Sequence, residues 1–203
     1  TISCMSISAQ CILLTYCSRV EVEEFKMRLH EMYGEIEPLF CELAVYDVDS
    51  REKVTETFFF DLNSQDILKR CGMKDAPHEH RNLRKAIMHI DERKQSMFLI
   101  LKVFKMLEGE NDKMADPYMN PEKSKSAAET IKKRVPEAGS YLFPFRQLLG
   151  WGAHPLFDEY DKLMMIPGSE DGDEGHMIFK EVFRVRHGLS DDALLESLAD
   201  LQA

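Results

Sequence analysis

The sequence predicts a mainly β protein, in which a mostly antiparallel sheet closes as a two-layer β-sandwich and the helices are peripheral. Short apolar segments rich in aromatic and β-branched residues recur between polar turns, as expected for strands. Helix signals are few and lie at the margins of these strand groups. With 203 residues, of which 44% are hydrophobic, the chain can bury one sizeable core. A sandwich is the simplest closure for so many short strands.

The first strand group begins with FKMRLHEM at 25–32, where apolar residues alternate with charged and polar ones. That two-residue period predicts a half-buried strand. Segments 39–48 and 54–62 are rich in aromatic and β-branched residues and flank a short acidic turn, which predicts a β-hairpin. Phe59 and Leu99 each lie in the middle of an apolar strand segment, so we expect both side chains in the core.

Further strand groups follow. Segments 86–90 and 97–107 are separated by six polar residues, which predicts a second hairpin with one strongly buried strand. Segment 141–151 is also strand-like, but Pro144 cannot donate a backbone hydrogen bond and favours an edge strand or a bulge. The strand pattern resumes at 176–185, which is also compatible with a short helix.

Two segments carry helix signals. Residues 121–135 have Pro121 at a suitable first position and basic residues in the last turn, so they predict a solvent-exposed helical insert. The C-terminal segment starts with Ser190 as a candidate N-cap. Its apolar stripe consists of Leu194, Leu195 and Leu198.

The bulk composition excludes several classes of protein. A net charge of −10 and a pI near 5.2 argue against nucleic acid or an anionic membrane as a dominant partner, because both need clustered Lys and Arg. Five scattered cysteines without CxxC spacing indicate a reducing compartment; they are Cys4, Cys11, Cys17, Cys41 and Cys71. No apolar stretch is long enough to cross a bilayer, so we expect a soluble cytoplasmic protein, and we interpret both ends of the chain as cuts.

Asp47, Asp49 and Asp61 bracket the first hairpin and are the candidate calcium ligands. Acidic residues at strand ends gather calcium in some β-sandwiches. Such a site would need further acids from another loop, whereas the same residues are common at the ends of strands for reasons of turn chemistry. The sequence therefore favours turn residues over a metal site.

Other groups with possible chemistry also lack a complete site. His78 and His80 have the spacing of a loop metal pair, but no third ligand is near in sequence. Segment 168–176 concentrates four acids between glycines without the ligand order of an EF-hand loop. Motifs of phosphate-binding loops, common hydrolases, zinc proteases and dinucleotide-binding folds are absent from the sequence. We expect no catalytic residue, no cofactor and no metal.

Several motifs in a fixed order carry a resemblance. Segment 35–64, EIEPLFCELAVYDVDSREKVTETFFFDLNS, is followed by MFLILKVFKMLEG, ADPYM, SYLFPF and LSDDALLESLADLQ. These segments resemble the N-terminal half of the DOCK (dedicator of cytokinesis) family of guanine-nucleotide exchange factors. The last is similar to the helix that precedes the lipid-binding docking-homology domain in the zizimin-like subfamilies. The residues of the first match are Glu37, Pro38, Phe40, Ala44, Tyr46, Asp47, Phe58, Phe59, Phe60, Asp61, Leu62, Asn63 and Ser64.

The resemblance implies a C2-like β-sandwich that works as a scaffolding module upstream of the lipid-binding domain. In the family, exchange on Rho-family GTPases belongs to a C-terminal catalytic region that this chain does not contain, so the chain is not expected to be an enzyme. The implied partners are neighbouring domains of the parent exchange factor or adaptor proteins. The alternative is a membrane-recruitment module, in which one end of the sandwich binds lipid directly and holds the protein peripherally at a membrane.

The expected domain organisation has three parts. Residues 1–24 form an N-terminal segment that could supply an extra strand. Residues 25–188 form the C2-like sandwich, with the helical insert near 121–135. Residues 189–203 start a linker helix towards a following domain.

Overall fold

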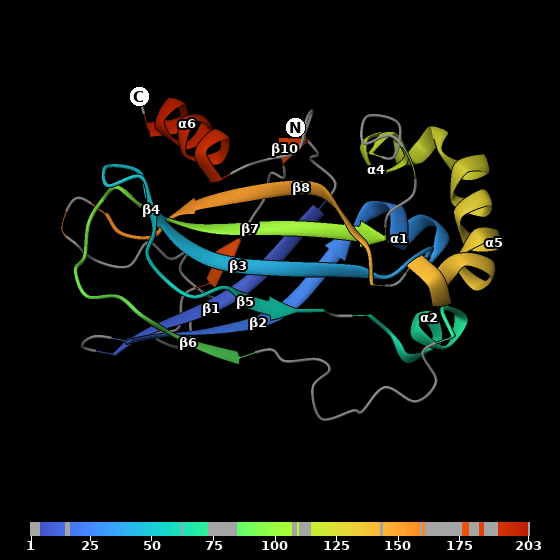
Figure 1. Cartoon of the computed structure of the whole chain (residues 1–203), viewed down its shortest axis with the longest axis horizontal. Helices are drawn as coiled ribbons and strands as arrows, with labels where there is room; N and C mark the ends of the chain where they lie inside the picture. Colours follow the sequence, from blue (N-terminus) through green and yellow to red (C-terminus); the bar gives the residue numbers. More distant parts are fainter. Residues whose placement is uncertain are drawn as a thin grey trace, which may run out of the picture.

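The computed structural model consists of two antiparallel β-sheets with helices packed around them (Figure 1). Of residues 5–28 only the backbone is described. The residues that the structure describes are 5–14, 17–61, 63–72, 85–106, 109, 115–142, 144–158, 160, 176–178, 183–184 and 191–202.

The larger sheet has the strand order β10-β8-β7-β3-β4, with β5 also paired to β3. Its centre consists of three long strands: β3 (Leu39–Asp47), β7 (Met97–Met106) and β8 (Arg146–Pro155). Leu43 lies opposite Leu101 in the β3–β7 register. The short strands are β4 (Glu52–Lys53), β5 (Phe58–Phe60) and β10 (Phe183–Arg184). The predicted first hairpin is confirmed, although its second strand is divided into β4 and β5.

The smaller sheet has the order β6-β2-β1-β9. β1 (Met5–Leu14) and β2 (Cys17–Met27) pair along their whole length, with one register shift between Ser8 and Ala9. The sheet is completed by β6 (Lys85–His89) beside β2 and β9 (His176–Ile178) beside β1.

The centre of the larger sheet is buried on both faces. Leu43 of β3 and Leu99 of β7 belong to the main core, to which Met88 and Ile90 at the end of the smaller sheet also contribute. On the other face, a second cluster contains Tyr46 and the side chains of the last helix. Because strand side chains alternate between faces, burial on both sides explains why these segments are nearly continuous in apolar residues.

The helices lie at one end of the sheets and on the outer face of the larger one (Figure 1). Ser64 caps α2 by accepting a hydrogen bond from the Ile67 amide. Gly34 and Gly72 follow α1 and α2 with φ of 70° and 76°, a backbone conformation that favours glycine and ends a helix. The helical elements are α1 (Arg28–Tyr33), α2 (Gln65–Arg70), α4 (Asp116–Met119), the 3₁₀ turn η2 (Pro121–Lys123), α5 (Lys125–Leu142) and α6 (Asp191–Gln202).

Two of the predicted strand assignments are wrong. The predicted strand at 25–32 ends at Met27, and α1 begins at Arg28, because a short alternating pattern also fits a helix that buries Leu29. The predicted second hairpin does not form. β6 pairs with β2 and β7 pairs with β3 and β8, so 91–96 connects two different sheets.

The region around Pro144 also differs from the prediction. α5 extends to Leu142 and β8 begins only at Arg146, so Pro144 precedes the strand and lies neither in an edge strand nor at a bulge. The register shift of β8 lies further on, opposite Val103 and Phe104.

The helix predicted at 121–135 is longer than expected and is not a solvent-exposed insert. Its face with Ala128, Ile131 and Val135 is buried in the main core. The prediction that Phe59 lies in the core is also wrong, since 63% of its surface is exposed. Phe58 and Phe60 stack with ring centroids 5.4 Å apart, and alternation along β5 then turns Phe59 to the opposite face. Leu99, by contrast, is fully buried as predicted.

Candidate interaction surface

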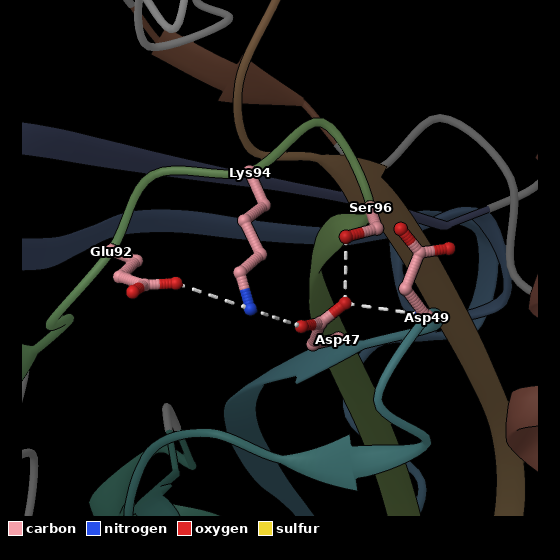
Figure 2. A network of polar contacts seen from close by, with 5 residues as sticks. All are labelled: Asp47, Asp49, Glu92, Lys94 and Ser96. Atoms are coloured by element: carbon pink, nitrogen blue, oxygen red, sulfur yellow. Dashed lines mark hydrogen bonds and ion pairs between the residues drawn. The ribbon is translucent and has the colours of Figure 1, made fainter.

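A polar network surrounds Asp47 at the end of β3 (Figure 2). Its carboxylate accepts hydrogen bonds from the Ser96 hydroxyl at 2.6 Å and from the Asp49 amide at 3.1 Å. Lys94 Nζ lies 3.2 Å from Asp47 Oδ2 and 3.4 Å from Glu92 Oε2. The network ties the turn after β3 to the segment that leads into β7.

The surroundings of Asp47 determine its ionisation. Burial alone would raise its pKa, but hydrogen bonds from Ser96, Lys94, Ser50 and the Asp49 amide together lower the pKa below its ordinary value. The carboxylate is therefore held in its charged form by protein donors.

The three candidate calcium ligands do not converge. Asp61 directly follows Phe60, which pairs with Cys41, whereas Asp47 lies six residues further along β3. At about 3.3 Å per residue, that separation is roughly 20 Å. Asp61 instead accepts a hydrogen bond from the Asn63 amide at 3.2 Å. Within the described ranges, no three His, Cys, Asp or Glu side chains form a group that could hold a metal ion.

A second polar cluster lies entirely inside the protein. Lys105 Nζ is 2.8 Å from Glu37 Oε1, and the Tyr118 hydroxyl donates to the same carboxylate oxygen. Lys105 is 0%, Glu37 1% and Tyr118 1% exposed. The ammonium group also lies 5.6 Å from the centroid of the Tyr118 ring. We call these three residues the buried triad.

The buried triad joins three of the motifs that carry the family resemblance. Glu37 comes from the Glu-Pro entry to β3, Lys105 from the long strand β7 and Tyr118 from the ADPYM segment. The sequence pattern does not single out Lys105 or Tyr118 as functional residues. Lys105 is one of two lysines in the apolar segment of β7, and a lysine in such a segment is a signal of a buried pair, because Lys is rarely buried unless paired.

The Asp-Leu-Asn-Ser motif also has a structural role. The Asn63 side chain accepts from the Leu39 amide and donates to the Leu39 carbonyl, with both distances 2.8 Å, so it pairs with the start of β3 as a strand would. Ser64 caps α2 and donates its hydroxyl proton to Glu35. These motif residues therefore stabilise the junction between β3 and α2.

Among the remaining candidates, the residues that the structure describes do not form a reactive group. His89 is exposed at the edge of the smaller sheet and pairs with Asp91, with Nε2 and Oδ1 2.8 Å apart. His78, His80 and the acidic segment 168–176, apart from the backbone of His176, lie outside the described residues. Burial raises the pKa of the Cys71 thiol to about 11, and burial also raises the pKa of Cys41. These two free thiols are therefore protonated at neutral pH and poor nucleophiles.

A groove lies between α5 and the end of β7, with a volume of about 200 Å³. Two charged residues of α5, Arg134 and Glu137, contribute to its lining and are exposed. The apolar lining consists of Met106, Ile131, Val135, Ala138 and Leu142. We call this feature the α5 groove.

Exposed aromatic residues follow the α5 groove in sequence. Tyr141 in the last turn of α5 is 78% exposed, and Phe145 just before β8 is 57% exposed. Both belong to the SYLFPF motif. Large apolar side chains that stay in solvent next to an apolar groove are typical of interaction sites. Among the described helices, none combines the length and apolarity needed to span a membrane.

The fold and its polar clusters define a class of protein: an antiparallel β domain with packed helices and an apolar surface groove. In this domain, Asp47 and Asp61 accept hydrogen bonds from neighbouring residues of the fold. Comparison with curated proteins adds the family. The chain is 34% identical over 131 residues to dedicator of cytokinesis protein 7 of Mus musculus, which covers 61% of this chain. It is 24% identical over 184 residues, or 82% of this chain, to dedicator of cytokinesis protein 9 of Mus musculus.

A plant protein shows a similar match. The chain is 24% identical over 144 residues, or 71% of its length, to the guanine nucleotide exchange factor SPIKE 1 of Arabidopsis thaliana. The resemblance to the DOCK family is therefore confirmed. The matched segments span only 6–8% of the length of these relatives. No protein-family model matches the chain, and no solved structure matches it.

Proposed function

We propose that the chain is a non-catalytic interaction module from the N-terminal half of a DOCK-type exchange factor for Rho-family GTPases. In this proposal, residues 25–188 and the strands that precede them form a C2-like sandwich, and residues 189–203 lead towards the lipid-binding domain of a zizimin-like parent. Because β2 spans Cys17–Met27, the β1–β2 hairpin is part of the same module.

The observation that carries the proposal is the buried triad. It uses one residue from each of three family motifs, and all three side chains are withdrawn from solvent. A site for chemistry needs groups that a substrate can reach. Motif residues that lie this deep support a role in stabilising the fold. An interaction module needs a stable fold, because the fold sets the surface that its partners contact.

The surface supports the same proposal. The α5 groove and the exposed side chains of Tyr141 and Phe145 place apolar area on the outside of the domain. The partners that bind this apolar area would be neighbouring domains of the parent exchange factor or cytoplasmic adaptor proteins. Exchange on the GTPase would then reside in another part of the parent.

A pull-down tests this function. The chain is immobilised and presented with the other domains of its parent exchange factor, each expressed separately. We expect saturable capture of at least one domain by the folded chain and none by the same chain after heat denaturation. Failure to capture any parental domain, together with capture by anionic vesicles, would replace this function with membrane recruitment.

A further inference from the structure

We propose that the α5 groove is a docking site for a helical peptide segment that carries one large apolar anchor side chain with acidic residues beside it. This inference rests on the proposed function and names the chemistry of the partner. It follows from the size of the groove, its lining and the distribution of charge around it.

The size of the groove selects a single side chain. Small-molecule and cofactor pockets have volumes of about 300–1,000 Å³, whereas a cavity of about 150 Å³ accommodates one benzene ring. At about 200 Å³, the α5 groove matches one Phe or Leu side chain. Five of its seven lining residues are apolar and come from β7 and α5, so the anchor would be desolvated on entry.

The charge around the groove selects acidic neighbours for that anchor. The chain as a whole has a net charge of −10, but segment 121–146 contains six Lys or Arg residues and only three Glu residues. Arg134 on the groove and Lys133 beside it in sequence are both exposed. A carboxylate next to the anchor would therefore be attracted by a cationic region on an otherwise acidic protein.

The groove also gives the bound segment a direction. Glu137 lies three residues after Arg134, and residues with this spacing share one face of a helix. An acidic residue of the partner is favoured near Arg134 and repelled near Glu137. The acids of the partner should therefore lie on the side of the anchor that faces the N-terminal half of α5.

Helix-in-groove recognition fits these features better than a lipid surface does. An apolar anchor from an amphipathic helix is a recurrent way to fill such a groove. An anionic membrane would respond to the same cations, but it would not need the groove. Modification of the groove without a change of charge therefore separates the two partners.

The test uses fluorescence anisotropy with the 203-residue chain and labelled helical peptides of roughly 16 residues, a length at which isolated helices begin to be stable. The probe peptide has one Phe anchor flanked by two Glu residues. One matched peptide replaces Phe with Ala, and another replaces both Glu residues with Lys. We expect saturable binding of the probe, loss of about tenfold in affinity for the Ala peptide and weaker binding of the Lys peptide.

Three variants of the chain locate the binding. Ala138→Leu fills the groove and should abolish binding of the probe. Arg134→Glu should weaken the probe several-fold and strengthen the Lys peptide. Lys53→Glu is the matched control: it makes the same change of charge on exposed β4, which pairs with β3 at the end of the larger sheet away from Met106, and should leave affinity unchanged. A thermal melt of each variant establishes that it is folded.

Other results overturn the inference. Equal binding of the Phe and Ala peptides, or unchanged binding by Ala138→Leu, would refute the groove as the site. Sedimentation of the chain with phosphatidylserine vesicles but not phosphatidylcholine vesicles, without peptide binding, would assign the cations to a membrane. If the peptides fail while the pull-down still captures a parental domain, the docking site is wrong and the proposed function stands.

Discussion

Replacement of Lys105 by Met tests the buried triad. The ammonium group is fully buried, 2.8 Å from Glu37 Oε1 and close to the ring of Tyr118. Met fills a similar volume but leaves the Glu37 carboxylate buried without its cation. Removal of one partner of a buried ion pair costs about 3–5 kcal/mol. Because domains are stable by only about 5–15 kcal/mol, this loss is a large fraction of the whole.

A compensated variant separates loss of charge pairing from loss of shape. In the triple variant Glu37→Leu, Lys105→Met, Tyr118→Phe, no polar group of the buried triad remains unsatisfied. We expect this variant to regain at least half of the stability that Lys105→Met loses, because a well-packed apolar replacement of a buried pair is often neutral or stabilising.

Urea unfolding followed by tryptophan fluorescence measures both effects. Trp151 is the single tryptophan of the chain and is 5% exposed, so its emission reports loss of the fold. A loss below about 1 kcal/mol in the free energy of unfolding for Lys105→Met would mean that Lys105 does not form a buried ion pair with Glu37. A triple variant as unstable as the single one would show that packing and not ion pairing determines the loss.

The remaining predictions concern the core, pH and calcium. Leu99→Ala should lower the free energy of unfolding in urea by about 2–5 kcal/mol, whereas Phe59→Ala should lower it by under about 1 kcal/mol because Phe59 is exposed. Comparable losses in the two variants would show that the described orientation of β5 is wrong. The pKa of Asp47 is lowered in the folded state, so its stabilising contribution is complete above its unfolded pKa of about 3.9 and lost as pH falls through the lower folded value. Asp47→Asn should therefore destabilise the chain near neutral pH and weaken the dependence of its stability on pH below about 4; melts in a pH series that match the parent would contradict this. Millimolar calcium should not raise the melting temperature, since Asp47 and Asp61 lie far apart; a rise that a chelator reverses and Asp47→Asn abolishes would reveal a site.

The long strands were predictable because their signal is local. β3 and β7 are nearly continuous apolar segments, and this pattern follows from burial on both faces. The partner of each strand was less predictable. Segments 86–90 and 97–107 are adjacent in sequence, but β6 pairs with β2, which is about 65 residues earlier in the chain. Strand pairing depends on competing surfaces elsewhere, which neighbouring residues do not encode.

The direction in which each side chain of a strand points was also difficult to predict from the sequence. Three successive phenylalanines predict a buried strand, but the pleat of β5 cannot place all three on one face, and Phe59 is the one that remains exposed. Lys105 shows the opposite case, a charged residue buried by a partner 68 residues away in sequence. The α5 groove was also not predictable from the sequence, since its lining combines a face of α5 with the end of β7.

We propose that this segment contributes contacts and not catalysis. Release of a fluorescent nucleotide from purified Rho-family GTPases, measured with increasing amounts of the chain, tests that claim most directly. We expect the same release rate with the chain as with buffer, for every GTPase in the panel. A release rate that increases with the concentration of the chain would contradict it.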